Sequence, residues 1–121
     1  MRERGDIFEA NDRGYHAGKH YIIFYSGNSD IDFIGAMVTH SQNEKNVQMS
    51  EQHFENISED GTQYKFQFDN TNLVKAKLFK FESWGPFTKI GKLTHSGIKF
   101  VEKTIDHLSA ETWEEYKERT K

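Results

Sequence analysis

Two apolar runs separated by a short polar turn constrain the fold of this chain most strongly. Residues 21–26 (Tyr-Ile-Ile-Phe-Tyr-Ser) and 32–39 (Asp-Phe-Ile-Gly-Ala-Met-Val-Thr) are rich in β-branched and aromatic side chains, and Gly27-Asn28-Ser29-Asp30 lies between them. Such runs favour strands, and a cluster of Gly, Asn, Ser and Asp favours a turn. We therefore expect the two segments to form an antiparallel hairpin.

A polar group stands at the open end of each strand of this hairpin. Lys19 and His20 precede the first strand, and the second strand ends in Thr39-His40-Ser41. Antiparallel pairing brings the start of one strand beside the end of its neighbour. The two polar groups would then lie close together, which makes this end of the hairpin the first candidate for a functional site.

Further short strands are expected on both sides of the hairpin. Asp60-Gly61 is a typical hairpin turn, and Tyr64, Phe66 and Phe68 alternate with polar residues, as in a half-buried strand. The polar stretch 41–49 is expected to be a loop. The additional strands are predicted over residues 6–10, 52–57, 62–69, 73–82 and 87–93.

The C-terminal part of the chain has helical periodicity instead. Thr94 is a suitable N-cap, and it precedes four apolar residues at helical spacing, Ile98, Val101, Ile105 and Leu108. Ser109 offers a second N-cap, and Trp113 and Tyr116 would share one helix face. The pattern predicts a mainly β fold with a C-terminal helix, and it favours a small antiparallel barrel over a sandwich.

Size and charge limit what the chain can do. Its 121 residues suit a single domain over 1–121, with the barrel at about 4–93 and the helical segment at about 94–121. Net charge is −3, from 16 Lys and Arg against 19 Asp and Glu, which argues against a nucleic-acid platform over the whole surface. Cysteine is absent, so disulfides and thiolate metal sites are excluded. No apolar run is long enough for a membrane span and the N-terminus lacks a signal-peptide core, so we expect a cytoplasmic protein that does not bind membranes.

Several short motifs, taken in order, resemble those of the PemK/MazF-like toxin family. Arg4-Gly5-Asp6-Ile7 resembles the family's opening Gly-Asp-Ile strand, and residues 17–23 (Ala-Gly-Lys-His-Tyr-Ile-Ile) resemble its Gly-x-Arg-Pro motif. Val38-Thr39-His40-Ser41 resembles the Thr-Thr or Thr-Ser element that ends the next strand. Residues 71–76 and 89–93 resemble the segment before the final helix. The match extends over roughly residues 4 to 108.

This resemblance implies both a fold and an activity. It implies an SH3-like barrel that forms a homodimer and acts as a metal-independent endoribonuclease. The substrate would be single-stranded RNA, and an antitoxin protein would hold the enzyme silent as part of a toxin–antitoxin system. In the family, the arginine of the Gly-x-Arg-Pro motif has the catalytic role; this chain has His20-Tyr21 at the Arg-Pro position.

Metal-free RNA cleavage needs a base for the 2′-hydroxyl proton, an acid for the leaving 5′-oxygen and a donor for the phosphorane charge. Histidine serves either proton-transfer role because its pKa lies near neutrality. We therefore expect His20 and His40 to form the acid–base pair, Lys19 to supply a cation, and Thr39 or Ser41 to donate a hydroxyl hydrogen bond. The predicted catalytic residues are Lys19, His20, Thr39 and His40.

Substrate binding is assigned to residues around this end of the hairpin. Tyr15 and Trp84 are candidates for stacking on RNA bases, Ser41 is a candidate for a hydroxyl contact with phosphate, and His16 is also assigned to substrate binding. His16 and His20 are four residues apart, a spacing that suits a metal pair on a helix. Gly18 between them indicates a loop and no carboxylate has a useful spacing, so we expect no metal and no cofactor.

Each of these residues also has a purely structural interpretation. His20 can cap a strand, His40 can be a solvated loop histidine, and Thr39 can satisfy strand backbone; most of the aromatic residues can simply fill the core. The replacement of the family's arginine by histidine motivates an alternative function, namely a catalytically inactive barrel that binds RNA or a protein partner. A third hypothesis is a barrel with a structural or assembly role.

Overall fold

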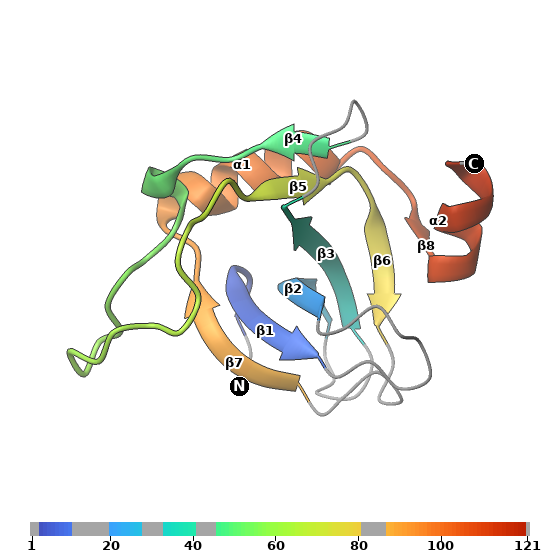
Figure 1. Ribbon diagram of the computed structural model, residues 1–121. Helices are drawn as coiled ribbons and strands as arrows, with labels where there is room; N and C mark the ends of the chain where they lie inside the picture. The colour runs from blue at the N-terminus through green and yellow to red at the C-terminus, as the bar shows by residue number, and fades with distance from the viewer. Residues whose placement is uncertain (1–2, 11–19, 28–32, 41–45, 81–86, 121) are drawn as a thin grey trace.

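The protein is mainly β, with an antiparallel sheet and two α-helices, the second of which is C-terminal (Figure 1). The computed structural model describes residues 3–10, 20–27, 33–40, 46–80 and 87–120, and only the backbone of His20 and Lys80. The strands are β1 Asp6–Ala10, β2 His20–Ser26, β3 Phe33–Thr39, β4 Asn46–Gln48, β5 Asn72–Val74, β6 Lys77–Lys80, β7 Phe87–Lys92 and β8 Ala110–Glu111. The helices are the 3₁₀ turn η1 Glu51–His53, α1 His95–Ile105 and α2 Trp113–Arg119.

The predicted hairpin lies at the centre of the sheet. Strands follow the order β4-β5-β3-β2-β1-β7, and β2 pairs with β3 in antiparallel register from Tyr21↔Val38 to Ser26↔Ile34. On the side away from β2, β3 pairs with two strands: β5 pairs with its end and β6 with its beginning. β8 adds a short parallel pairing to β6. The hairpin prediction is therefore confirmed, and it fixes the centre of the fold.

Four of the predicted segments differ in the structure. The stretch 41–49 was expected to be a loop, but residues 46–48 form β4, because they find a partner in β5. The predicted strand over 73–82 is interrupted after β5, where the Ala76 amide donates to the Val74 carbonyl at 2.9 Å, and resumes as β6. The strands predicted over 52–57 and 62–69 are wrong, since this region contains η1 and only the isolated bridges Phe54↔Leu93 and Ile57↔Gln63.

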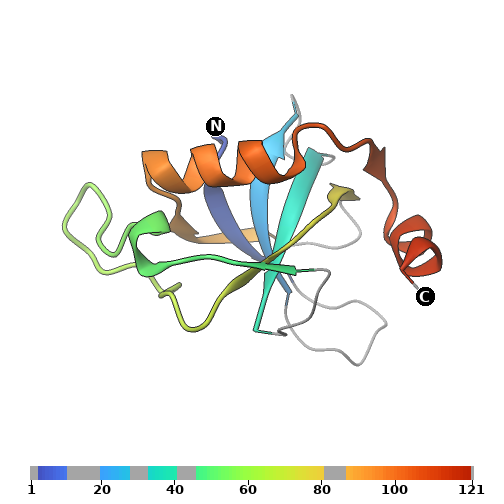
Figure 2. The same ribbon diagram turned by 90° about the horizontal axis from the view of Figure 1, so that it is seen from above.

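Strand alternation divides the buried side chains between two faces of the sheet. Ile23 and Tyr25 of β2 belong to one cluster, which also includes Val101 and Ile105 of α1. Ile22 and Phe24 belong to a second cluster, against which Trp113 and Tyr116 of α2 pack. Figures 1 and 2 show α1 crossing the sheet, with α2 and the turn around residues 58–62 at opposite sides of the molecule.

Both helices begin at a capping threonine. Thr94 accepts a hydrogen bond from the Gly97 amide at 3.1 Å, as the sequence predicted. A side chain at Gly97 would bring its Cβ to 2.2 Å from the His53 carbonyl oxygen, so only glycine allows α1 to approach η1 this closely. The second predicted N-cap, Ser109, is wrong: Thr112 caps α2 in a capping box with Glu115. Neither α-helix in the described part of the chain is long and apolar enough to span a membrane.

Tyr25 connects β2 to the end of α1. Its hydroxyl donates to Asp106 Oδ1 at 2.5 Å, and the guanidinium of Arg4 lies 4.2 Å from the ring centroid. Burial and the Asp106 carboxylate raise the pKa of Tyr25 to about 12, and the same hydrogen bond lowers the pKa of Asp106. Lys77 donates to the Asp106 main-chain carbonyl at 2.7 Å, a favourable place for a cation at a helix C-terminus. These contacts hold the Tyr25 side chain in the core.

Candidate functional site

The start of β2 lies beside the end of β3 in the sheet. Tyr21 of β2 lies opposite Val38 of β3, and the next step of this register places the backbone of His20 opposite Thr39. The predicted neighbourhood of the two strand ends is confirmed at the level of the strands. Any reaction centre built from these residues would therefore have a rigid sheet beneath it.

Strand parity separates Thr39 from His40. Thr39 shares the parity of Met37 of the second core cluster. His40, in contrast, lines a pocket together with Tyr21, whose parity is that of Ile23. The described side chains therefore build a site around His40 on the face of the sheet that carries α1.

A main-chain carbonyl orients His40. Its Nδ1 lies 2.7 Å from the carbonyl oxygen of Asp69, and because a carbonyl only accepts, Nδ1 must carry the hydrogen. In the neutral ring, Nε2 is then the unprotonated nitrogen, and it has no hydrogen-bond partner among the residues that the structure describes. An exposed imidazole held in one tautomer by a main-chain acceptor is a suitable general base.

A tight turn after residue 68 places that carbonyl. Asn70 adopts a positive φ of 48°, which Asn tolerates better than most residues. The Asn72 side chain, itself buried, donates to the Asn70 carbonyl at 2.9 Å, and the Asp69 amide donates to Thr71 Oγ1 at 3.3 Å. Since β5 begins at Asn72 and pairs with Thr39, the turn is fixed directly beside His40.

The pocket beside His40 is small and has both aromatic and polar walls. Its volume is about 160 Å³, and the Tyr21 and Phe66 rings meet edge to face with their centroids 5.5 Å apart. The ammonium of Lys65 makes an ion pair with Glu9 at 3.0 Å. The lining residues are Tyr21, His40, Lys65, Phe66, Gln67, Asp69 and Ile90. We call this group the His40 pocket.

The other predicted site residues differ in how far the structure describes them. Thr39 is half-buried at the end of β3, where it is paired with Asn72, in line with its structural interpretation. The side chain of His20 is outside the described part of the chain. The remaining predicted site residues lie outside the described residues altogether: Tyr15, His16, Lys19, Ser41 and Trp84.

Lys65, Gln67 and Asp69 were not predicted as site residues. Lys65 and Gln67 alternate with Tyr64, Phe66 and Phe68, and this pattern indicates the solvated face of a half-buried strand. The Asp69-Asn70 pair is the signal that could have indicated a turn, since both residue types favour one. Nothing in the spacing, however, indicates that Asp69 lies beside His40, 29 residues away.

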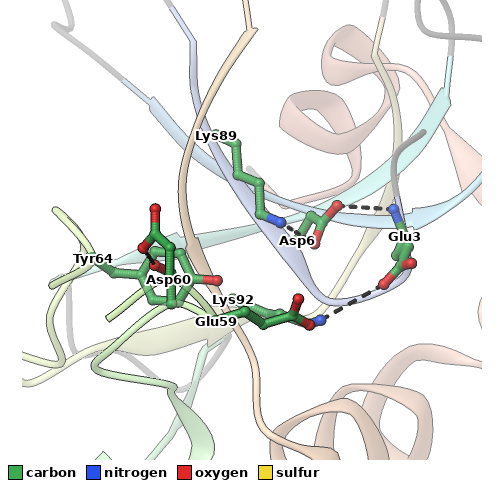
Figure 3. Close-up of a pocket in the computed structure, with 8 residues that line it drawn as sticks. Glu3, Asp6, Glu59, Asp60, Tyr64, Lys89 and Lys92 are labelled. Atoms are coloured by element: carbon green, nitrogen blue, oxygen red, sulfur yellow. Dashed lines mark hydrogen bonds and ion pairs between the residues drawn. The ribbon is translucent and has the colours of Figure 1, made fainter. Parts of the chain in front are cut away.

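A second and larger pocket, of about 370 Å³, lies between the N-terminus, β7 and the turn at residues 58–60 (Figure 3). Four of its six charged side chains form two ion pairs. Asp6, only 2% exposed, makes an ion pair with Lys89 at 3.2 Å and accepts from the Glu3 amide at 2.9 Å, and Glu3 faces Lys92 at 3.6 Å. We call this group the ion-pair pocket.

Within the described part of the chain, no group of three or more His, Asp or Glu residues is arranged to hold a metal ion. Comparisons of the chain with protein-family models, with curated proteins and with solved structures gave no match. The function proposed below therefore rests on the geometry of the pockets.

Proposed function

We propose that the chain is a metal-independent endoribonuclease that cleaves single-stranded RNA at the His40 pocket. The observation that carries this proposal is the hydrogen bond from His40 Nδ1 to the Asp69 carbonyl, which leaves Nε2 as the proton acceptor of an exposed imidazole. Base-stacking rings and a cation lie next to it, in Tyr21, Phe66 and Lys65. These are the groups that recognition and cleavage of an unpaired nucleotide require.

The reaction would proceed by transfer of the phosphoryl group within the RNA. His40 Nε2 takes the proton of a 2′-hydroxyl as the 2′-oxygen attacks the adjacent phosphorus. The bond to the 5′-oxygen then breaks, leaving a 2′,3′-cyclic phosphate, and the departing oxygen takes a proton from a general acid. His20 is the acid in this proposal, with Lys19 and Ser41 as donors to the phosphate; Thr39 keeps its structural role at the end of β3. A well-placed proton-transfer group contributes about 10²- to 10⁴-fold to such a rate.

The biological setting follows from the same proposal. The strand order and the curvature of the sheet (Figure 1) are compatible with closure into an SH3-like barrel, in line with the resemblance described above. In this proposal the protein is a homodimeric cytoplasmic toxin, and an antitoxin binds it until the toxin is released. Expression of the toxin would arrest growth, and replacement of a catalytic histidine would relieve the arrest.

Cleavage of a labelled single-stranded RNA in the presence of EDTA tests the proposal. His40→Ala is expected to slow cleavage by about 10²- to 10⁴-fold while its thermal unfolding stays that of the wild type, because the side chain is exposed. His107→Ala is the matched control, since His107 is also an exposed histidine but lies outside the pocket. His20→Ala, measured in parallel, tests the proposed acid. Equal cleavage by wild type and His40→Ala would contradict the assignment of His40.

The alternative function, binding without cleavage, is supported by one observation. The ammonium of Lys65 is already paired with Glu9, so the pocket offers phosphate no unengaged lysine among the residues described. A protein that retains single-stranded RNA in gels but leaves it uncut at every pH would support an RNA-binding barrel instead. Capture of a protein partner without RNA binding would support the protein-binding form of this alternative.

A further inference from the structure

The side-chain amide of Gln67 has a defined orientation in the His40 pocket. Its Nε2 donates to the main-chain carbonyl of Tyr64 at 2.7 Å and lies 3.5 Å from the carbonyl of Asn56. Both partners are carbonyl oxygens, which only accept, so the nitrogen of the amide must face the main chain. The amide oxygen Oε1 is left as an acceptor without a donor among the described residues.

Asp69 supplies a second acceptor to the same pocket. Its main chain is engaged, since the carbonyl holds His40 and the amide donates to Thr71. Its carboxylate accepts no hydrogen bond within the described part of the chain, and the residue is exposed. Gln67 and Asp69 are two residues apart and both line the pocket, so two acceptors are available to one ligand.

The size of the pocket limits that ligand to about one planar ring. Its volume of about 160 Å³ is well below the roughly 300–1,000 Å³ of sites for drug-sized molecules. The Tyr21 and Phe66 rings form an apolar wall of the kind on which unpaired bases stack. A single nucleobase extruded from an RNA strand fits these properties.

The two acceptors select among the four bases. On their Watson–Crick edges, adenine and cytosine each present one amino donor beside a ring-nitrogen acceptor, and uracil presents one N–H between two carbonyl oxygens. Only guanine presents two adjacent donors, its N1–H and its 2-amino group. A carboxylate and an amide oxygen are complementary to that pair, and the hydrogen bonds to the carboxylate are charge-assisted.

We propose that the His40 pocket binds a guanine base of single-stranded RNA, with Gln67 Oε1 and the Asp69 carboxylate accepting from N1–H and the 2-amino group. This inference rests on the proposed function, because it takes RNA to be the ligand of the pocket. It deepens that function by making Gln67 and Asp69 the residues that determine specificity. It also places the scissile phosphate next to a guanosine, because His40 lines the same pocket.

Binding of wild-type protein to four short oligouridylates tests the inference, each with one central base: guanine, hypoxanthine, adenine or uracil. Hypoxanthine differs from guanine only by the missing 2-amino group, so it isolates one of the two donors. The guanine oligonucleotide is expected to bind about 10- to 100-fold more tightly than the hypoxanthine one, the range for one hydrogen bond to a charged group. Equal affinities for all four oligonucleotides would overturn the proposal.

Two variants assign the preference to its residues. Asp69→Asn keeps the shape of the side chain and the main-chain hydrogen bond to His40 but removes the charge, so it is expected to lose most of the preference for guanine. Glu59→Gln, in the wall of the ion-pair pocket, is the matched control and should retain the preference. A preference unchanged in Asp69→Asn would exclude the carboxylate as its source.

Cleavage of the same oligonucleotides separates this inference from the proposed function. Cleavage of all four at equal rates, lost in His40→Ala, would keep the nuclease and overturn guanine recognition. Preferential binding of the guanine oligonucleotide without cleavage would keep the recognition and overturn the nuclease. Absence of binding to any of them would overturn both.

Discussion

The ion-pair pocket and the His40 pocket differ in what their polar groups do. The ion-pair pocket has more than twice the volume of the His40 pocket, but its buried carboxylate is compensated from within, by the ammonium of Lys89. The His40 pocket has an imidazole oriented by one hydrogen bond. It also has an amide oxygen, of Gln67, and a carboxylate, of Asp69, that accept no hydrogen bond in the described part of the chain. If RNA binds in the His40 pocket as proposed, unsatisfied polar groups and not volume determine where the ligand binds.

The largest expected effect is on stability and concerns the ion-pair pocket. Asp6 Oδ1 is buried and accepts no hydrogen bond from the described residues, so its ion pair with Lys89 is what compensates for its burial. Lys89→Met would leave that charge buried and unpaired, and we expect it to lower the free energy of unfolding by about 3 kcal/mol. Urea denaturation measures this loss, and RNA binding by the folded variant should not change.

Lys92 provides the matched control on the same strand. Its ion pair with Glu3 is longer, at 3.6 Å, and the Glu3 side chain is 68% exposed, so Lys92→Met should cost less than about 1 kcal/mol. Equal losses in the two variants would contradict the view that burial of Asp6 decides the energetic role of Lys89.

A contrast between local pattern and long-range pairing explains how much of the fold the sequence could predict. The β2–β3 hairpin follows from local pattern alone, because both strands are long and a sequence typical of turns, Gly27-Asn28-Ser29-Asp30, lies between them. β4 has only three residues and exists because β5 pairs with it, so no local pattern indicates it. Residues 62–69 have the alternation of a strand, yet they contact the sheet mainly through Phe66, whose amide donates to the Ile90 carbonyl at 2.9 Å.

The candidate site was predictable only in part, for a similar reason. His40 was identified because it ends a strand next to a predicted neighbour. Its partner Asp69 depends on the turn at Asn70, and that turn is held by Asn72, at the start of β5. Contacts over 29 residues of chain come from sheet topology, which the spacing of motifs does not encode. The positions of Gln67 and Asp69 in the pocket therefore follow only from the structure.

A smaller effect, on RNA affinity, is expected from the ion pair between Glu9 and Lys65 at the His40 pocket. Glu9, only 9% exposed, holds the ammonium of Lys65 with both carboxylate oxygens, at 3.0 and 3.2 Å. Glu9→Gln would release this cation to a phosphate, and we expect RNA affinity to rise by about fivefold, equivalent to about 1 kcal/mol. Fluorescence anisotropy with a labelled oligonucleotide measures the change.

The salt dependence of that binding distinguishes a new phosphate contact from a change in pocket shape. One additional contact to single-stranded RNA should make the slope of log K against log salt steeper by about 0.7. Glu55→Gln, an exposed carboxylate outside both pockets, should leave both the affinity and the slope unchanged. A rise in affinity without a steeper slope would argue against release of Lys65.

The smallest expected effect is a pH dependence of stability that comes from a histidine outside both pockets. His53 Nδ1 accepts a hydrogen bond from the Ser50 amide at 3.0 Å, the opposite role to that of His40 Nδ1, and burial lowers the pKa of His53. Between that lowered pKa and the usual value near 6.5, the unfolded chain binds more protons than the folded one, so stability rises with pH in this window. The contribution is complete above about pH 6.5 and is lost as the pH falls below it.

His53→Gln separates this effect from catalysis. Glutamine at the third position of a helical turn can still accept from the N-cap amide, as in a capping box, but it does not titrate. The variant is therefore expected to unfold at a midpoint that depends less on pH between 5 and 7, while the pH profile of RNA cleavage stays that of the wild type. A cleavage profile that moves with His53→Gln would mean that the two histidines are coupled, since the fold gives them separate surroundings: His53 packs against Phe100 of α1, and His40 lines the pocket with Tyr21.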